Sequence, residues 1–286
     1  MTEATSDYAR PTALPEALAL LAAGPRTVLA GGTDLYPATQ AQRLAGPLLD
    51  ITALDGLAGI TAGPDGLRIG AGTTWTALAE ADLPPALVAL QQAARLVGGR
   101  QIQNAGTLGG NLCNASPAAD GVPPLLVLGA EVELASVRGV RRLPLERFVL
   151  GVRKTALAAD ELLTAVHIPA AALAGRSAFV KLGARAYLVI SIAMVAVRIV
   201  AERGQVVEAA LAVGACSAVA RRLPAVEAAL VGAPLSEVAA RITEAEVAAA
   251  LSPIADIRGT ADYRLEAACV LLRRAVTQAL PVEEPA

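Results

Sequence analysis

Short apolar runs and amphipathic stretches alternate along this chain of 286 residues, and glycine or proline bounds most of them. In the first half, an apolar stretch at 27–30 predicts a buried strand, and the sequence LYPATQAQRL from Leu35 is typical of a helix. The turn sequence Gly63-Pro64-Asp65-Gly66 between two apolar segments predicts a β-hairpin. Further helices are expected at 15–23, 75–81 and 84–97, and further strands at 131–136 and 162–168.

The second half begins after the sequence AALAGR, which ends at Arg176 and is typical of a linker. A strand at 177–183 and a long hairpin that turns at 202–205 are expected next. Three helices follow, at 224–231, 244–249 and 261–280. This order, strands and then helices, predicts an α+β domain that packs beside the first part of the chain.

Composition narrows the class of protein. With 55% hydrophobic and 17% charged residues, the chain can bury a full core in one large or two moderate domains. The longest uncharged apolar run, 188–197, has about half of the ~20 residues that a membrane span requires. The N-terminal sequence MTEATSDYARP lacks the basic and apolar regions of a signal peptide, so we expect a cytoplasmic protein without a membrane span. A net charge of −2 without a basic stripe argues against nucleic-acid binding.

The scarcity of histidine and cysteine restricts the chemistry. One histidine and three cysteines cannot assemble a zinc site, a Ser-His-Asp triad or a four-cysteine iron–sulfur cluster within one chain. His167 lies in an alternating, strand-like segment, which favours a hydrogen-bonded structural histidine over a catalytic one. For Cys113 we favour a small buried apolar residue, because free cysteine commonly packs that way.

Two glycine-rich segments are the strongest functional signal. The first is LAGGTDLYP from Leu29, and the second is NAGTLGGNLCNASPAAD from Asn104. Glycine permits positive φ and leaves room for a phosphate to approach backbone N–H groups. Neither segment has the spacing of a dinucleotide fingerprint or of a Walker loop, and either one alone could be a plain turn. Together they could hold a diphosphate between two loops.

In this order and at this separation, the two segments resemble those of the FAD-binding medium subunit of the molybdenum hydroxylases, the family of xanthine dehydrogenase and carbon monoxide dehydrogenase. The resemblance continues in KLGARAYLVISIAMVAVRI from Lys181 and in ADYRLEAACVLLRRAV from Ala261. It implies an α+β fold in which an FAD-binding domain of the vanillyl-alcohol-oxidase (PCMH-like) type spans 1–174, with subdomains at about 1–55 and 56–174. A smaller C-terminal α+β domain, a three-stranded sheet with helices, would span 175–286.

The resemblance also implies which residues bind FAD. Backbone N–H groups of the first segment would be donors, the second segment would form a loop, and Asp120 would accept hydrogen bonds from a cofactor hydroxyl or amine. Leu163 would pack against the ring system, and Lys181 would be a polar neighbour of the flavin; from the pattern alone they could be an inward core leucine and an exposed strand residue. The full set is Val28, Leu29, Ala30, Gly31, Gly32, Thr33, Asp34, Leu35, Thr107, Gly109, Gly110, Asn111, Asp120, Leu163 and Lys181.

The implied function is that of an FAD-carrying electron-transfer subunit. FAD would be bound non-covalently, a large partner subunit would hold the molybdenum cofactor, and a small partner subunit would hold [2Fe–2S] clusters. The complex would be a dimer of heterotrimers and would deliver electrons to an external acceptor. Two alternatives stay open. A stand-alone flavoprotein oxidase or reductase would need its own acid or base, for which Tyr36, Ser116 and Tyr187 are the candidates; a flavin-free assembly scaffold would need neither.

Overall fold

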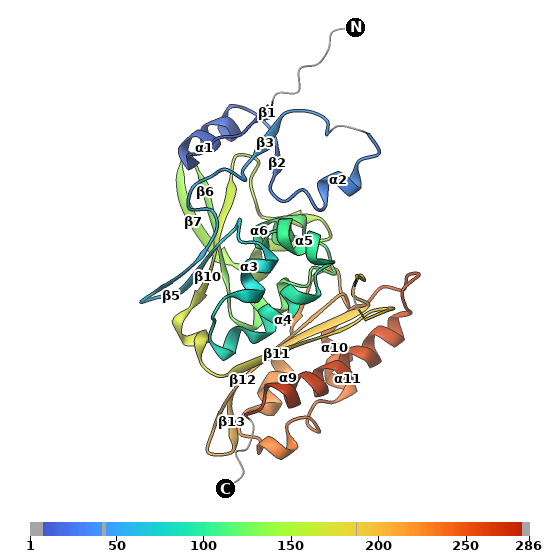
Figure 1. Cartoon of the computed structure of the whole chain (residues 1–286). Coiled ribbons are helices and arrows are strands. Elements are labelled where there is room, and N and C mark those ends of the chain that lie inside the picture. The colour runs from blue at the N-terminus through green and yellow to red at the C-terminus, as the bar shows by residue number, and fades with distance from the viewer. Residues whose placement is uncertain (1–7, 42–43, 187, 282–286) are drawn as a thin grey trace.

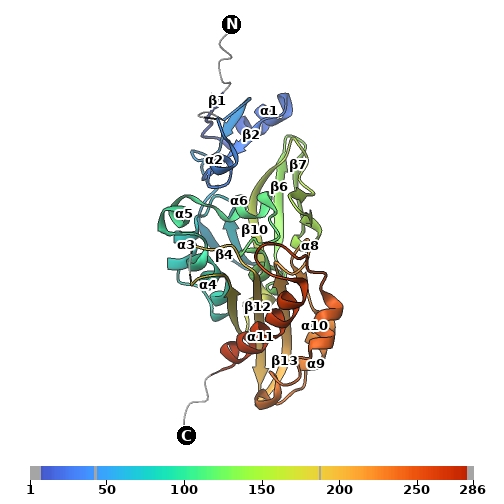
Figure 2. The ribbon, with the colours of Figure 1, turned by 90° about the vertical axis from the view of Figure 1, so that its right-hand side faces the viewer.

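The structure is a computed structural model and describes residues 8–41, 44–186 and 188–281. Three units follow one another along the long axis of the molecule (Figure 1). A small N-terminal unit lies at one end, a five-stranded sheet with helices forms the middle, and a second sheet with helices forms the other end. Figure 2 shows the same order from the side.

The N-terminal unit is a small parallel sheet with two helices. Its strands β1 (Tyr8–Ala9), β3 (Leu48–Asp50) and β2 (Thr27–Leu29) lie in that order, and its helices are α1 (Leu14–Ala23) and α2 (Leu35–Ala38). The longer helix predicted from Leu35 is wrong, because α2 ends after one turn and Thr39 is extended. Residues 36–38, 40 and 41 are exposed, so this stretch has no apolar face to bury, and residues 42 and 43 lie outside the described part.

The middle unit is an antiparallel sheet with helices packed on one face. Its strand order is β4-β5-β10-β6-β7, and β8 and β9 form a separate hairpin. The strands are β4 (Ile60–Gly63), β5 (Gly66–Gly70), β6 (Glu131–Ser136), β7 (Gly139–Pro144), β8 (Val149–Gly151), β9 (Lys154–Thr155) and β10 (Leu162–Pro169). The helices are α3 (Trp75–Glu80), α4 (Val88–Leu96), α5 (Arg100–Ala105), α6 (Leu108–Asn114), α7 (Val122–Val127) and α8 (Leu145–Phe148), with 3₁₀ turns at Pro85–Leu87 and Ala170–Leu173.

The C-terminal unit is a sheet of the order β11-β12-β13-β14, covered by helices. Its elements are β11 (Arg176–Leu182), β12 (Ala193–Glu202), β13 (Gln205–Gly214), β14 (Arg221–Arg222), α9 (Pro224–Leu230), a 3₁₀ turn at Leu235–Glu237, α10 (Glu244–Ala250) and α11 (Ala261–Ala279). The expected three-stranded sheet is corrected to four strands. The fourth strand, β14, has two residues, too few for an apolar alternation, and Arg222 is fixed by an ion pair with Glu227 at 2.6 Å.

The apolar run around β12 is explained by burial on both faces of the sheet. Met194 and Ala196 pack into the core shared with the middle unit, whereas Val195 and Val197 pack into the core under α11. A strand covered on both sides needs no polar alternation. In the described part of the chain, no helix is both long and apolar enough to cross a membrane.

Candidate functional site

The two glycine-rich segments lie against each other in space. A Cβ added to Gly31 would lie 1.8 Å from the carbonyl oxygen of Ala105, so only glycine allows this approach of the two backbones. A second contact joins the side chains, because Asn114 Nδ2 donates to Asp34 Oδ1 at 2.7 Å. The structure therefore brings together two segments that are about seventy residues apart in the sequence, as the diphosphate hypothesis requires.

The first segment offers backbone donors. Among the described residues, the N–H groups of Gly31, Gly32, Thr33 and Asp34 have no intrachain acceptor. Gly32 has φ of +68°, and a Cβ there would also lie 2.6 Å from the ring of Tyr36. Consecutive N–H groups in such a turn form a concave site for an anion.

The second segment is helical, which corrects the expected loop. Helix α6 begins after Thr107, whose Oγ1 accepts from the Gly110 N–H at 3.0 Å, and the Gly109 N–H donates to the carbonyl of Ala71 at 2.8 Å. Gly109 serves close packing, because a Cβ there would lie 2.7 Å from the Cβ of Ala71. These two N–H groups are therefore not available to a ligand.

Asn111 provides the unpaired polar group of this segment. Its Oδ1 is buried and has no hydrogen-bond donor among the described residues. A buried acceptor without a partner costs about 1–3 kcal/mol, so it is a place where a ligand hydroxyl or amine would be stabilising. A cofactor that carries a diphosphate and several hydroxyl groups fits three observations. These are the unpaired Oδ1 of Asn111, the free N–H groups of the first segment and the close approach of Gly31 to Ala105.

Trp75 packs against the second glycine-rich segment, a role that the sequence did not reveal. It is only 2% exposed, and its backbone N–H donates to the Gly106 carbonyl at 3.1 Å. Cβ atoms added to Gly106 and Gly121 would lie 3.2 and 2.7 Å from its indole ring. The glycines around the segment thus make room for this single tryptophan.

Asp120 and Lys181 are paired with each other across the junction between the middle and C-terminal units. Lys181 Nζ lies 2.6 Å from Asp120 Oδ2, and Ser191 Oγ donates to Asp120 Oδ1 at 2.6 Å. Both side chains of the ion pair are 7% exposed, so the exposed strand position considered for Lys181 is wrong. Burial raises the pKa of Asp120, and Lys181 and Ser191 offset part of this rise. Both carboxylate oxygens of Asp120 are thus already engaged within the chain.

Leu163 lies on β10 with 3% of its surface exposed, in the core of the middle unit. Its cross-strand partner on β6 is Leu134, and the register shifts just after it. This is the environment expected of an inward core leucine. A contact between Leu163 and a flavin ring stays a prediction.

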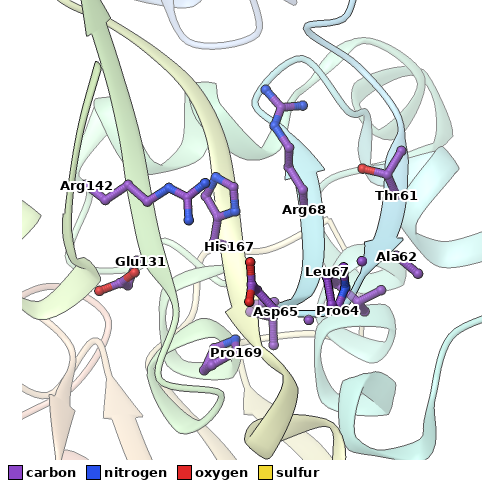
Figure 3. A pocket seen from close by; sticks show the side chains of 13 residues that line it. Thr61, Ala62, Pro64, Asp65, Leu67, Arg68, Glu131, Arg142, His167 and Pro169 are labelled. Atoms are coloured by element: carbon purple, nitrogen blue, oxygen red, sulfur yellow. The ribbon is translucent and has the colours of Figure 1, made fainter. Parts of the chain in front are cut away.

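A pocket of about 290 Å³ lies elsewhere, over the β4–β5 turn and the neighbouring strands (Figure 3). His167 is hydrogen-bonded, as predicted, since its Nε2 lies 2.8 Å from Glu133 Oε2. Arg68 and Arg142 lie 3.3 and 3.4 Å from the same carboxylate. Burial opposes ionisation of Glu133, but hydrogen bonds from Thr164 and His167 and the charge of Arg68 outweigh it and lower its pKa. Arg68, Arg142 and His167, which line the pocket, are thus paired with Glu133, and we assign no ligand to the pocket. Among the described residues, His, Cys, Asp and Glu form no group that could hold a metal.

Cys113 is exposed, so the buried position favoured for it is wrong, whereas Cys216 and Cys269 are buried. Its thiol is nevertheless surrounded by protein, and this desolvation raises the pKa of Cys113 to about 12. Cys113 is on α6, next to Asn114, whose side chain donates to Asp34 of the first glycine-rich segment.

We expect Cys113 to react slowly with maleimide, because thiolate is the nucleophile and a raised pKa leaves little of it. With a pKa about three units above the ordinary thiol value, alkylation at about pH 8 should be roughly a thousandfold slower than for a free cysteine. The rate should still rise tenfold per pH unit at about pH 10, without a plateau. Mass spectrometry of the labelled protein measures this rate, and Cys113→Ser gives the background of the two buried thiols. A plateau below about pH 9 would contradict the prediction.

Comparison with known proteins identifies the class. Residues 3–171 match the family model of the FAD binding domain in molybdopterin dehydrogenase, and residues 178–279 match that of the CO dehydrogenase flavoprotein C-terminal domain. The chain belongs to the family of FAD-binding subunits of molybdopterin dehydrogenases. It is 35% identical to the carbon monoxide dehydrogenase medium chain of Afipia carboxidovorans, over 98% of each chain.

A second relative is the xanthine dehydrogenase FAD-binding subunit of Escherichia coli O157:H7, which is 42% identical over 171 residues. That match covers 57% of this chain and only 58% of the length of the E. coli subunit.

Two solved structures match nearly the whole chain. A reconstituted CO dehydrogenase from Oligotropha carboxidovorans has a TM-score of 0.89 at 33% identity, over 98% of this chain and 99% of that one. Quinoline 2-oxidoreductase from Pseudomonas putida 86 has a TM-score of 0.85 at 29% identity, over 98% of both chains. The resemblance stated from the sequence, the FAD-binding domain and the fold class are confirmed.

Proposed function

We propose that the chain binds FAD non-covalently between the two glycine-rich segments and is the electron-transfer subunit of a molybdenum hydroxylase complex. The observation that carries this proposal is the close approach of Gly31 to Ala105, which brings the N–H groups of residues 31–34 next to the turn between α5 and α6. When bound, FAD would supply the redox chemistry, collecting single electrons from partner [2Fe–2S] clusters and passing pairs to an external acceptor.

The chain's own residues would bind and orient the cofactor. Backbone N–H groups of Gly31, Gly32 and Thr33 would donate to the diphosphate, and Asn111 Oδ1 would accept from a cofactor hydroxyl or amine. Lys181 would lie next to the flavin while it stays paired with Asp120. Asp120 would then hold the Lys181 side chain in position. The remaining members of the proposed site are Val28, Leu29, Ala30, Asp34, Leu35, Thr107, Gly109, Gly110 and Leu163. The proposed FAD-binding domain is 1–174, and the proposed C-terminal domain is 175–286.

The proposed complex contains a large molybdenum-cofactor subunit and a small [2Fe–2S] subunit, arranged as a dimer of heterotrimers. Apolar side chains on the surface of this chain support association with other subunits: Ile257 is 99% exposed, and Ile254 and Ile190 are more than half exposed. The three cysteines are free thiols, which supports a cytoplasmic location because that compartment is reducing.

A stand-alone oxidoreductase is the second candidate, and the structure offers it little support. Tyr36 packs its ring against Gly32, and Ser116 Oγ accepts from the Ala118 N–H at 3.2 Å. Tyr187 lies outside the described residues. A flavin-free scaffold would not require the close approach of Gly31 to Ala105 or the unpaired Oδ1 of Asn111.

The test is the visible spectrum of the complex, co-expressed with the genes next to its own, before and after anaerobic addition of candidate substrates. Flavin and iron–sulfur bands that bleach together are the expected result. Flavin that co-purifies and bleaches without partner subunits would favour the stand-alone enzyme. A complex that contains iron–sulfur clusters but no flavin would favour the scaffold.

A further inference from the structure

The two glycine-rich segments lack a positive charge of their own. Residues 28–35 and 104–120 contain no lysine or arginine, and each range contains an aspartate. Bound FAD would bring a diphosphate next to the carboxylate of Asp34, which is an unfavourable contact of like charges. The ammonium group of Lys181 is already paired with Asp120. A full positive charge that offsets the diphosphate would therefore have to come from another part of the chain.

Arg153, in the turn of the β8–β9 hairpin, is connected to both segments. Its backbone N–H donates to the carbonyl of Ala115 at 2.9 Å. Its guanidinium Nη1 donates to the Asn114 carbonyl at 3.3 Å and also to Asn114 Oδ1. Asn114 in turn donates to Asp34 at 2.7 Å. Arg153, Asn114 and Asp34 thus form a hydrogen-bonded chain, which we call the Arg153 bridge, from the hairpin through α6 to the first segment.

The backbone of this contact is held in an uncommon conformation. Arg153 has φ of 55° and Ala115 has φ of 46°, in the left-handed region that residues other than glycine rarely adopt. Such conformations are costly and persist where the surrounding structure imposes them, often at ligand sites. Three hydrogen bonds hold Arg153 in place, so its positive charge is positioned before any ligand binds.

We propose that Arg153 is a positioning residue for the diphosphate of FAD. It holds the two glycine-rich segments together through Asn114, and its charge offsets that of Asp34 beside the cofactor. This inference rests on the proposed function, because it requires that FAD binds between the two segments. It adds a residue from a third, separate part of the chain to the proposed site.

The test uses the full chain and measures the dissociation constant of FAD by quenching of flavin fluorescence. Arg153→Gln should weaken FAD binding about tenfold, the loss expected for one charge-assisted interaction. Asp34→Asn keeps the acceptor for Asn114 but removes the negative charge. Introduced into the Arg153→Gln variant, it should restore most of the affinity. A purely structural role of Arg153 would predict no such rescue.

Two further variants control the result. Lys154→Gln removes a positive charge from the neighbouring, exposed residue and should leave the affinity for FAD unchanged. Arg153→Gly removes the guanidinium but suits the positive φ, so it tests the same loss of charge if Arg153→Gln does not fold. If the unaltered chain binds no FAD, the proposed function itself fails. If it binds FAD and both Arg153 variants bind equally well, or if Asp34→Asn restores nothing, the role of Arg153 is overturned.

Discussion

Replacing Gly31 by alanine is expected to lower the affinity for FAD by at least about a hundredfold. The new Cβ would lie 1.8 Å from the Ala105 carbonyl oxygen and 2.4 Å from its carbonyl carbon. Both are backbone atoms, so the clash cannot be relieved by a side-chain rotation, and the two glycine-rich segments must move apart. A misplacement of about 1 Å can cost a factor of about a hundred in a catalytic rate, and we expect a loss of at least that size in binding here. Fluorescence titration with FAD measures the loss.

Gly24→Ala is the matched control in the same N-terminal unit. Nothing lies within 4 Å of a Cβ at Gly24, and its φ of 164° is extended backbone that alanine adopts freely. This variant should bind FAD like the unaltered chain. Circular dichroism should show that Gly31→Ala keeps its secondary structure, since the clash is local. FAD binding within a factor of three of the unaltered chain would refute a site that depends on this approach.

Local signals in the sequence were sufficient to predict elements whose conformation depends on their own residues. The strand at 131–136 was predicted with its observed bounds, and the Gly63-Pro64-Asp65-Gly66 turn does join β4 and β5. The predicted helix at 75–81 is also observed, as α3, and the Thr74 side chain caps it by accepting from the Ala77 N–H. Such elements depend on periodicity and turn chemistry, which a single sequence displays.

The failures arose where a residue acts through a distant neighbour. Glycines in α6 suggested a loop, but Gly109 is required by its contact with Ala71, which the sequence does not display. The role of Trp75 depends on packing against Gly121, and that of Arg153 depends on a hydrogen bond to Ala115. Neither residue stands out in its local sequence. Asp120 and Lys181 were both named through the family resemblance, but their pairing is a contact between separate units that only the structure shows.

The second large effect is expected from Lys181→Met. This substitution removes one partner of the buried Asp120–Lys181 ion pair between the middle and C-terminal units. An unpaired buried carboxylate is strongly destabilising, so we expect the free energy of unfolding to fall by about 3–5 kcal/mol. Asp120→Asn in the same chain keeps an acceptor for Ser191 and removes the uncompensated charge, so the double variant should recover most of the stability. Urea unfolding of the three proteins measures these differences.

The pH dependence of this loss distinguishes an unpaired charge from a simple packing defect. Without Lys181, burial raises the pKa of Asp120 further above its unfolded value, so the folded state binds a proton more readily than the unfolded state. The loss should therefore shrink as the pH is lowered, because protonation neutralises the carboxyl group. Arg241→Ala is the control, since the exposed Arg241–Glu237 pair should contribute at most about 1 kcal/mol. The opposite result is a loss of stability that does not depend on pH and that Asp120→Asn does not relieve. It would mean that the two units are held together by packing of the Lys181 side chain and not by the Lys181 charge.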